Sequence, residues 1–96
     1  MKVVWTSQAL QDRVDILEYI SKDNPRAAVR LDEFFSESAK RLAAHPKLGR
    51  PGKIPGTREI IAHESYRLIY EINGDIVWML ALVHTLRQWP FVRDSG

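Results

Sequence analysis

The sequence predicts an α+β domain with elements in the order βααβββ and an antiparallel sheet packed on an N-terminal helical hairpin. Apolar residues recur at helical spacing over residues 7–44, and strand-forming residues dominate residues 58–86. Between the last two strand segments, Asn73-Gly74 is typical of a hairpin turn. Because 96 residues is the size of one domain, we expect residues 1–96 to share a single core.

The first helix is predicted from residue 7 to residue 22, after a short strand with the sequence KVVW at residues 2–5. Thr6 or Ser7 offers a side-chain oxygen that can cap the helix N-terminus. The apolar stripe expected to face the core consists of Leu10, Val14, Leu17 and Ile20.

The second helix is predicted to begin at Pro25 and to end near residue 44 or 45. Asn24 is a good N-cap, and a first helical residue does not need the N–H that Pro25 lacks. Pro46 disfavours helical geometry in the residue before it. The expected buried stripe is Ala27, Leu31, Phe34, Phe35, Ser38 and Leu42. The turn between the helices is short, so the helices should lie antiparallel.

Three strands are predicted at residues 58–62, 66–72 and 76–86. In the last two, the even positions are apolar or aromatic and should face the helices. Even positions meet across the hairpin only if its loop has three residues, with Gly74 in the left-handed conformation. In that register Arg87 lies opposite Glu59 on the face away from the helices.

The composition favours a cytoplasmic protein without a metal or cofactor. Cysteine is absent, no apolar run is long enough to span a membrane, and no secretory signal precedes the first strand. The three histidines are scattered without metal-ligand spacing. The glycines at 49, 52 and 56 open onto a strand, not onto a phosphate-binding helix. We therefore expect no cofactor, no metal and no membrane partner.

Charge is segregated along the chain. Residues 40–58 carry six cations and no acid, whereas residues 12–37 carry seven acids and four cations. The candidates for contact with a partner or a phosphate are Lys47, Arg50, Lys53 and Arg58. The alternative is a loop whose cations only keep it solvated.

Arg67 and Arg87 should share the sheet face away from the helices, with His84 near the end of its strand. Such a set suits contact with a phosphate better than acyl transfer. The alternatives are structural: Arg87 forms an exposed ion pair with Glu59, and His84 is a hydrogen-bonded residue at the rim of the core.

Several segments together resemble the RelE/ParE superfamily of toxins from type II toxin-antitoxin modules. They are DILEYI, NPRAA, AAHPKLGRP, GTRE, SYRLIYEI and ALVHTLRQW, which follow a short N-terminal strand, and in this order the match covers essentially residues 3–90. The resemblance implies a growth-arresting bacterial toxin that is neutralised by a cognate antitoxin wrapped around it.

The RelE-like branch of this superfamily is an endoribonuclease that cleaves mRNA on the ribosome, where the ribose 2′-OH attacks the neighbouring phosphate. Resemblance to this branch implies Arg67, His84 and Arg87 as catalytic residues. The lysine pair of RelE is reduced to Arg58 with Ile60, and the C-terminal tyrosine of the branch is met by Arg93. The full RelE catalytic set is therefore absent.

The ParE-like branch inhibits DNA gyrase and carries a turn of the form HP-x-x-G-x-P after the second helix. His45, Pro46, Gly49 and Pro51 reproduce this turn, which favours the ParE-like interpretation, without catalysis. A third interpretation is a basic nucleic-acid-binding module in which Trp89 and Phe91 stack on bases. Packing of these aromatics against the sheet is the simpler alternative.

Overall fold

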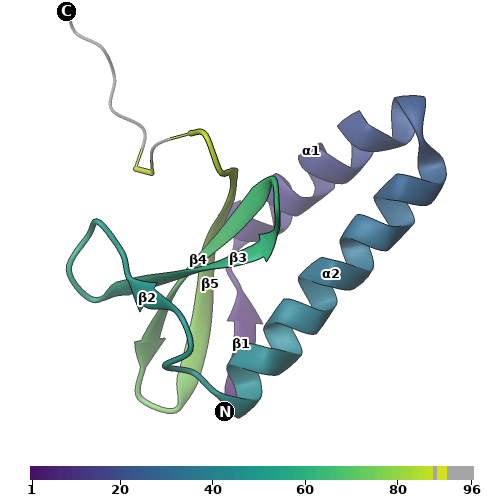
Figure 1. The fold of residues 1–96 in the computed structure, drawn as a ribbon. Coiled ribbons are helices and arrows are strands. Elements are labelled where there is room, and N and C mark those ends of the chain that lie inside the picture. Colours follow the sequence, from purple (N-terminus) through teal and green to yellow (C-terminus); the bar gives the residue numbers. More distant parts are fainter. Residues whose placement is uncertain (88, 91–96) are drawn as a thin grey trace, which may run out of the picture.

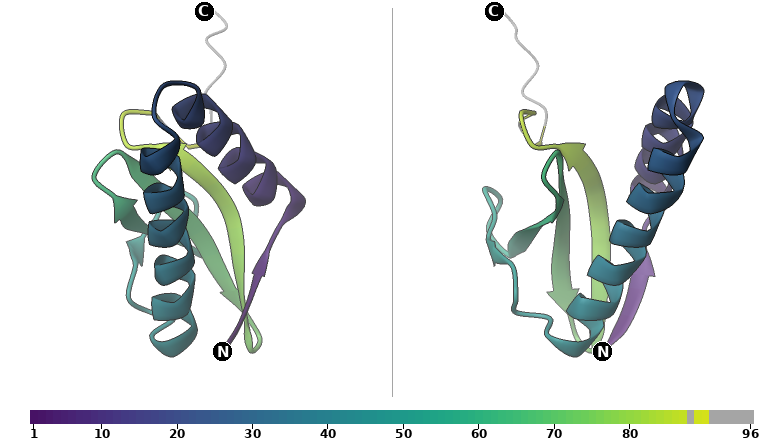
Figure 2. Two further views of the ribbon diagram at one scale, coloured as in Figure 1. Left: turned by 90° about the vertical axis from the view of Figure 1, so that its right-hand side faces the viewer. Right: turned by 45° about the vertical axis from the view of Figure 1, so that its right-hand side comes forward.

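In the computed structural model, which describes residues 1–87 and 89–90, a helical hairpin covers one face of a sheet (Figure 1). Within this part of the chain the sheet has five strands in the order β1-β5-β4-β3-β2. The elements are β1 (Lys2–Trp5), α1 (Ser7–Asp23), α2 (Pro25–Ala44), β2 (Arg50–Pro51), β3 (Thr57–His63), β4 (Tyr66–Asn73) and β5 (Ile76–His84). Figure 2 shows the helices together on one side of the sheet. The predicted α+β class is confirmed, and no helix among the described residues is long and apolar enough to cross a membrane.

The sheet is mixed, which corrects the expectation of a wholly antiparallel one. β1 pairs in parallel with β5, in a register that sets Val3 beside Val77. The helical hairpin brings the chain back beside the start of β1, where the N-terminus contacts the Ala43 carbonyl. β3 therefore runs in the same direction as β1, and the antiparallel meander β3-β4-β5 then places β5 parallel to β1. β2 was not predicted, because two residues are too short to show a strand pattern.

Both predicted helix N-caps are confirmed. The Thr6 hydroxyl accepts a hydrogen bond from the Ala9 N–H at 3.1 Å, and the Asn24 side chain accepts one from the Ala27 N–H at 3.1 Å. Each oxygen satisfies one of the N–H groups that a helix N-terminus leaves without a partner. These local contacts explain why both helix starts were predictable.

The predicted core stripe of α1 is wrong in its first half. Leu10 and Val14 are 49% and 46% exposed, whereas Ala9 is fully buried. Arg13 instead turns toward α2 and donates to Asp32 at 2.8 Å, with its guanidinium 4.8 Å from the Trp5 ring. The small Ala9 side chain lets this turn of α1 approach the sheet, which rotates Leu10 and Val14 outward.

The core stripe of α2 is mostly as predicted. Leu31, Phe35, Ser38 and Leu42 are buried, while Phe34 is 42% exposed. Leu31, Phe35 and Leu42 pack on the helix-facing side of the sheet, in one core cluster with Leu68, Tyr70, Val77, Met79 and Leu82.

The β4–β5 hairpin has a two-residue loop, so the predicted three-residue loop is wrong. Asn73 pairs with Ile76 around Gly74-Asp75. Gly74 has the predicted positive φ, at 63°, in the first central position that type II′ turns give to glycine.

The side-chain alternation of β5 changes at a bulge within the strand. Ile69 pairs with Ala81 but Tyr70 pairs with Met79, so Leu80 is an extra residue on β5. Val77 and Met79 are therefore buried in the core, contrary to the predicted even-numbered face, whereas Leu82 beyond the bulge is buried as predicted. The sequence showed that even-numbered apolar residues on both strands cannot meet across a two-residue loop. It did not show that a bulge within β5 resolves this conflict.

The connector between α2 and β3 is held to the sheet by the Tyr70 hydroxyl. This hydroxyl accepts from the Gly49 N–H at 2.8 Å and donates to the Pro46 carbonyl at 2.7 Å. A Cβ on Gly49 would lie 2.6 Å from the hydroxyl oxygen and 2.9 Å from the Glu59 carbonyl oxygen. The connector can therefore pass this close to the sheet only with glycine at position 49.

Tyr70→Phe is expected to lower the free energy of unfolding by about 1–3 kcal/mol, because the Gly49 N–H and the Pro46 carbonyl lose their shared partner. Urea unfolding of the purified chain measures this change. Tyr19→Phe is the matched control, since Tyr19 is 71% exposed and its variant should stay within about 0.5 kcal/mol of the parent. Equal stability of the two variants would contradict the role assigned to Tyr70.

Stability should also fall at alkaline pH. Burial raises the pKa of Tyr70 above its ordinary value, although the Gly49 hydrogen bond and the Arg58 charge oppose this. The folded state thus holds the phenolic proton more tightly than the unfolded chain, and this contribution is lost as pH rises through the folded-state pKa. Burial also raises the pKa of Tyr66, so the Tyr70→Phe substitution should remove only part of the decrease in stability that occurs above about pH 10. An undiminished decrease in that variant, followed by urea unfolding, would disprove the linkage.

Candidate functional site

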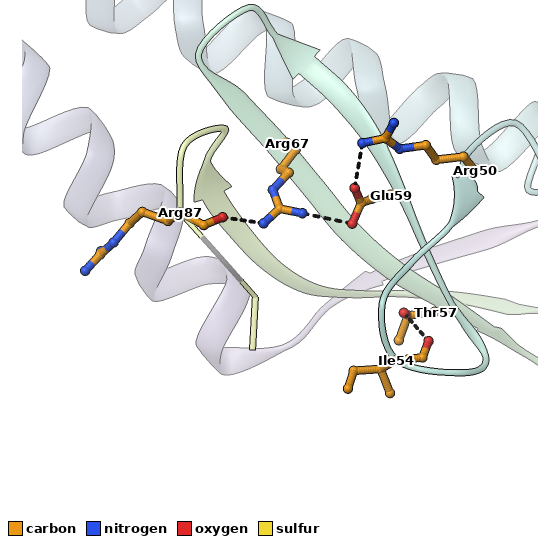
Figure 3. Close-up of polar contacts among 6 residues, drawn as sticks. All are labelled: Arg50, Ile54, Thr57, Glu59, Arg67 and Arg87. Atoms are coloured by element: carbon orange, nitrogen blue, oxygen red, sulfur yellow. Dashed lines mark hydrogen bonds and ion pairs between the residues drawn. The ribbon is translucent and has the colours of Figure 1, made fainter. Parts of the chain in front are cut away.

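A cluster of charged residues lies on the open face, meaning the sheet face opposite the helices, and centres on Glu59 of β3 (Figure 3). Arg67 of β4 donates to its Oε2 at 2.9 Å, and Arg50 of β2 pairs with its Oε1 at 3.1 Å. Arg67 also donates to the backbone carbonyl of Arg87. The registers explain these contacts: Arg50 is directly opposite Glu59, and Arg67 is on its diagonal.

The two arginines of this cluster differ in exposure. The side chains of Arg67 and Glu59 are only 14% and 10% exposed, whereas that of Arg50 is 74% exposed. Within the part of the chain that the structure describes, the buried Arg67 Nε has no hydrogen-bond partner. Arg67 is thus committed to Glu59 and to the Arg87 backbone, while Arg50 leaves most of its surface to solvent or to a partner.

A positively charged cavity of about 340 Å³ adjoins the cluster. It is lined by Lys53, Glu59, Arg67, Thr85, Leu86, Arg87 and Trp89. Three cations against one carboxylate give this cavity a field that attracts anions. Trp89 packs on Ile69, Ala81 and Val83, which agrees with the simpler interpretation of that aromatic; Phe91 and Arg93 lie outside the described residues.

His84 lies on the other face of the sheet from Arg67. It pairs with Tyr66 across β4 and β5, with ring centroids 5.6 Å apart, and its Nδ1 accepts from the Leu86 N–H at 3.1 Å. Since successive strand residues point to opposite faces, Tyr66 and His84 face the helices while Arg67 points away. His84 is a hydrogen-bonded residue at the core rim, as the structural alternative predicted.

Arg87 lies between the two faces. It lines the cavity beside Arg67 and also a cavity of about 450 Å³ on the helix side, together with Asp12, Asp15, Tyr19 and His84. Figure 3 shows its side chain extending away from Glu59. The predicted cross-strand pair of Arg87 with Glu59 is wrong, because β4 separates β3 from β5. Neither of these cavities contains both Arg67 and His84.

The four connector cations do not form one surface. Arg58 faces the helix side opposite Tyr70, and its guanidinium donates to the Gly49 carbonyl at 2.7 Å and approaches the Lys47 carbonyl at 3.5 Å. Lys47 and Lys53 are exposed, and Lys53 lines the cavity beside Arg67. Arg58 therefore holds the connector, whereas Arg50 and Lys53 remain available on the open face.

The sequence analysis missed the central position of Glu59 and the backbone contact of Asp12. The Asp12 carboxylate accepts from the Leu82 N–H at 3.1 Å, beside the bulge in β5. The β2–β3 pairing that brings Arg50 to Glu59 has no sequence signal beyond the Gly-Pro spacing of the connector. No group of three or more potential metal-ligating side chains occurs among the described residues.

A family model described as "ParE toxin of type II toxin-antitoxin system, parDE" matches residues 3–89. The chain belongs to this family. A candidate toxin of Sinorhizobium fredii called Y4kP is 38% identical over 92 residues, which is 95% of each chain. Toxin RelE2 of Caulobacter vibrioides is 31% identical over 86 residues, covering 90% of this chain and 97% of that protein.

Solved structures share the fold. The chromosomal ParDE toxin-antitoxin system from P. aeruginosa matches with a TM-score of 0.77 and 23% identity, covering 88% of this chain and 95% of the other. A YoeB/ParE toxin from Agrobacterium tumefaciens matches with a TM-score of 0.62 and 17% identity, covering 88% and 98%. The chain is thus a toxin of a type II toxin-antitoxin system in the ParE/RelE family, and an antitoxin is its expected partner.

Glu59→Gln should lower the free energy of unfolding by about 2–4 kcal/mol, because it leaves the nearly buried Arg67 guanidinium without its carboxylate. Glu37→Gln removes an equivalent charge from the exposed pair with Lys40 and should cost less than about 0.5 kcal/mol. Urea unfolding of both variants measures the difference. Similar small losses in both would mean that the Glu59–Arg67 pair is an ordinary surface ion pair.

Proposed function

We propose that this toxin arrests growth as ParE-like toxins do, by inhibiting DNA gyrase, and that it catalyses no RNA cleavage. The observation that carries this proposal is that Arg67 and His84 project from opposite faces of the sheet. The match of the ParE family model to residues 3–89 supports it further.

The chemistry of RNA cleavage explains why this separation matters. Attack of a 2′-OH on the neighbouring phosphate needs a base, an acid and cations around one phosphate group. His84 uses its Nδ1 to accept the Leu86 N–H, and Arg67 uses donors on Glu59 and on the Arg87 carbonyl. A phosphate on the open face would meet Lys53 and Arg50, but it would not meet the imidazole.

The RelE-like function remains the second candidate because two observations favour it. A relative with 31% identity is called Toxin RelE2, and Arg87 adjoins both the Arg67 cavity and the His84 cavity. In this alternative the target is ribosome-bound mRNA, and Arg87 with His84 carries the chemistry.

A direct comparison of the two targets tests the proposal. Purified toxin should inhibit gyrase supercoiling, while transcripts in cells that express it from a tightly repressed promoter should remain whole within translated codons. If transcripts are cleaved within translated codons and supercoiling is unaffected, the target is ribosome-bound mRNA and not gyrase.

The double variant His84→Ala, Arg87→Ala adds a second arm to this test. It removes the candidate acid-base group and the exposed arginine while leaving the Arg67–Glu59 pair in place. Supercoiling inhibition per folded molecule should change less than about threefold, because inhibition by binding needs no acid-base group and most exposed side chains contribute little to an interface. If the variant abolishes transcript cleavage in cells, the RelE-like function is established instead.

A further inference from the structure

We propose that a cavity near the turn of the helical hairpin binds a small organic anion, meaning a carboxylate or a phosphate monoester carried on a compact apolar body. This hairpin-tip cavity has a volume of about 290 Å³ and lies between α1, α2 and one end of the sheet. Its polar lining consists of Arg30, His63, Ser65, Tyr66 and His84. The inference goes beyond gyrase inhibition and does not depend on the choice between gyrase and mRNA as the target.

A row of three ring side chains forms the sheet side of this cavity. His63 of β3 pairs with Tyr66 of β4, and Tyr66 pairs with His84 of β5. Directly paired residues share a face of the sheet. That face is the one toward the helices, because the Tyr66 and His63 rings lie 6.0 Å and 5.2 Å from the rings of Phe35 and Phe34 in α2. Three neighbouring strands thus present two imidazoles and a phenol to one cavity.

Backbone contacts determine which polar atom each imidazole leaves for a ligand. The His63 Nδ1 accepts from the Ser65 N–H at 3.4 Å, and the His84 Nδ1 accepts from the Leu86 N–H at 3.1 Å. An imidazole that accepts at Nδ1 carries its proton on Nε2. The polar group that each ring leaves for a ligand is therefore an N–H donor.

The remaining polar groups of the hairpin-tip cavity also donate. The Arg30 guanidinium has donors only, and the Ser65 and Tyr66 hydroxyls each carry a proton. Burial raises the pKa of Tyr66, so its phenol keeps that proton at neutral pH. Within residues 1–87 and 89–90, none of these three side-chain groups has a hydrogen-bond partner. A ligand rich in acceptors would satisfy all of them.

The charge of the lining distinguishes this cavity from its neighbour. Among the described residues no acidic side chain lines the hairpin-tip cavity, whereas Asp12 and Asp15 line the cavity of about 450 Å³ beside it. Donors around an arginine, without a carboxylate to neutralise it, attract an anion and disfavour a cation. The ligand of the hairpin-tip cavity is therefore anionic.

The helix side of the cavity is apolar apart from Arg30. It consists of Ile20 of α1 with Ala27, Leu31 and Phe34 of α2. Covering these side chains with an apolar body removes both surfaces from water, which inorganic phosphate alone cannot do. Small-molecule sites commonly have volumes of roughly 300–1,000 Å³. A cavity of about 290 Å³ is at the lower end of this range and suits one ring with its charged group, not a length of peptide or nucleic acid.

The test uses phenyl phosphate and phenylacetate as probes of the two anionic groups. Titrated into the purified chain, they should shift the NMR signals of the His63 and His84 imidazoles saturably, with a Kd of about 1 mM. Benzylamine lacks the negative charge and inorganic phosphate lacks the apolar body, so each should bind at least about tenfold more weakly. Saturation by one anion alone would identify its charged group as the ligand class. Absence of saturation by both anions would overturn the proposal, as would equal binding of either control compound.

A matched pair of arginine variants tests the role of charge. Arg30→Gln should weaken binding of the anions about fivefold or more, because it removes the cation from the cavity. Arg26→Gln, one turn earlier on α2 and outside the cavity lining, should bind within about twofold of the parent. Equal losses in the two variants would mean that the anions respond only to the overall charge of the protein, which contradicts a specific site.

Two amide substitutions at His63 test the proposed Nε2–H donor. His63→Asn keeps an acceptor near the position of Nδ1 but removes the donor, and it should weaken binding about fivefold. His63→Gln carries an amide N–H near the position of Nε2 and should recover most of the affinity. The His84 signals report binding in both variants, and urea unfolding confirms that both are folded. If His63→Asn binds the anions as tightly as the parent and His63→Gln do, His63 donates nothing to the ligand and the proposed site is wrong.

Discussion

The path of the chain between α2 and β3 depends on the buried hydroxyl of Tyr70. This oxygen has one donor and one acceptor partner on the connector, and both are backbone groups that would otherwise be buried without partners. Because Gly49 is thereby fixed against the sheet, Arg50 emerges opposite Glu59. The charged cluster of the open face thus depends on a hydrogen bond made on the other side of the sheet.

The alternation of side chains along β4 places Arg67 and His84 on opposite faces of the sheet, although the sequence places both near the end of the hairpin. Arg67 and Tyr66 are neighbours in the chain but point to opposite faces, and the pairing with β5 places His84 beside Tyr66. The Arg67 guanidinium and the His84 imidazole therefore lie on opposite sides of the sheet. The same alternation directs Arg58 toward Tyr70, where its charge supports the connector instead of a partner.

Features set by local chemistry were predictable, and features set by tertiary packing were not. Thr6, Asn24 and Pro25 fixed the helix starts, and the Asn73-Gly74 pair indicated the hairpin, because each acts on its own neighbours. The bulge at Leu80 accommodates a distant neighbour, since the Leu82 N–H beyond it binds Asp12 of α1.

The same distinction holds for the candidate site. The sequence identified Arg50, Arg67 and Arg87 as cations of interest, and all three lie at or near the open face. It could not identify Glu59 as the shared partner of Arg50 and Arg67, because that role comes from a two-residue strand and a diagonal contact between strands. The sequence placed His84 on the correct face of the sheet. It did not show that this position keeps the imidazole out of the cavity beside Arg67.

The two edges of the sheet differ in a way that bears on partner choice. At the β1 edge, residues 3–5 are partly buried, and the strand is joined to the rest of the fold by the Thr6 N–H, which donates to the Met79 carbonyl at 3.0 Å. Where β1 ends, the Asp12 carboxylate accepts a hydrogen bond from the Leu82 N–H of β5, so a side chain covers that part of the edge.

The β3 edge has no equivalent cover at Ile61 among the described residues. The Ile61 side chain is also more exposed than that of any other described isoleucine. An uncovered apolar edge carries a risk of aggregation in a free chain, but the risk disappears if the toxin is made together with a partner that covers it. The exposure of Ile61 therefore fits a toxin that is held in a complex with a partner better than a toxin that stays free.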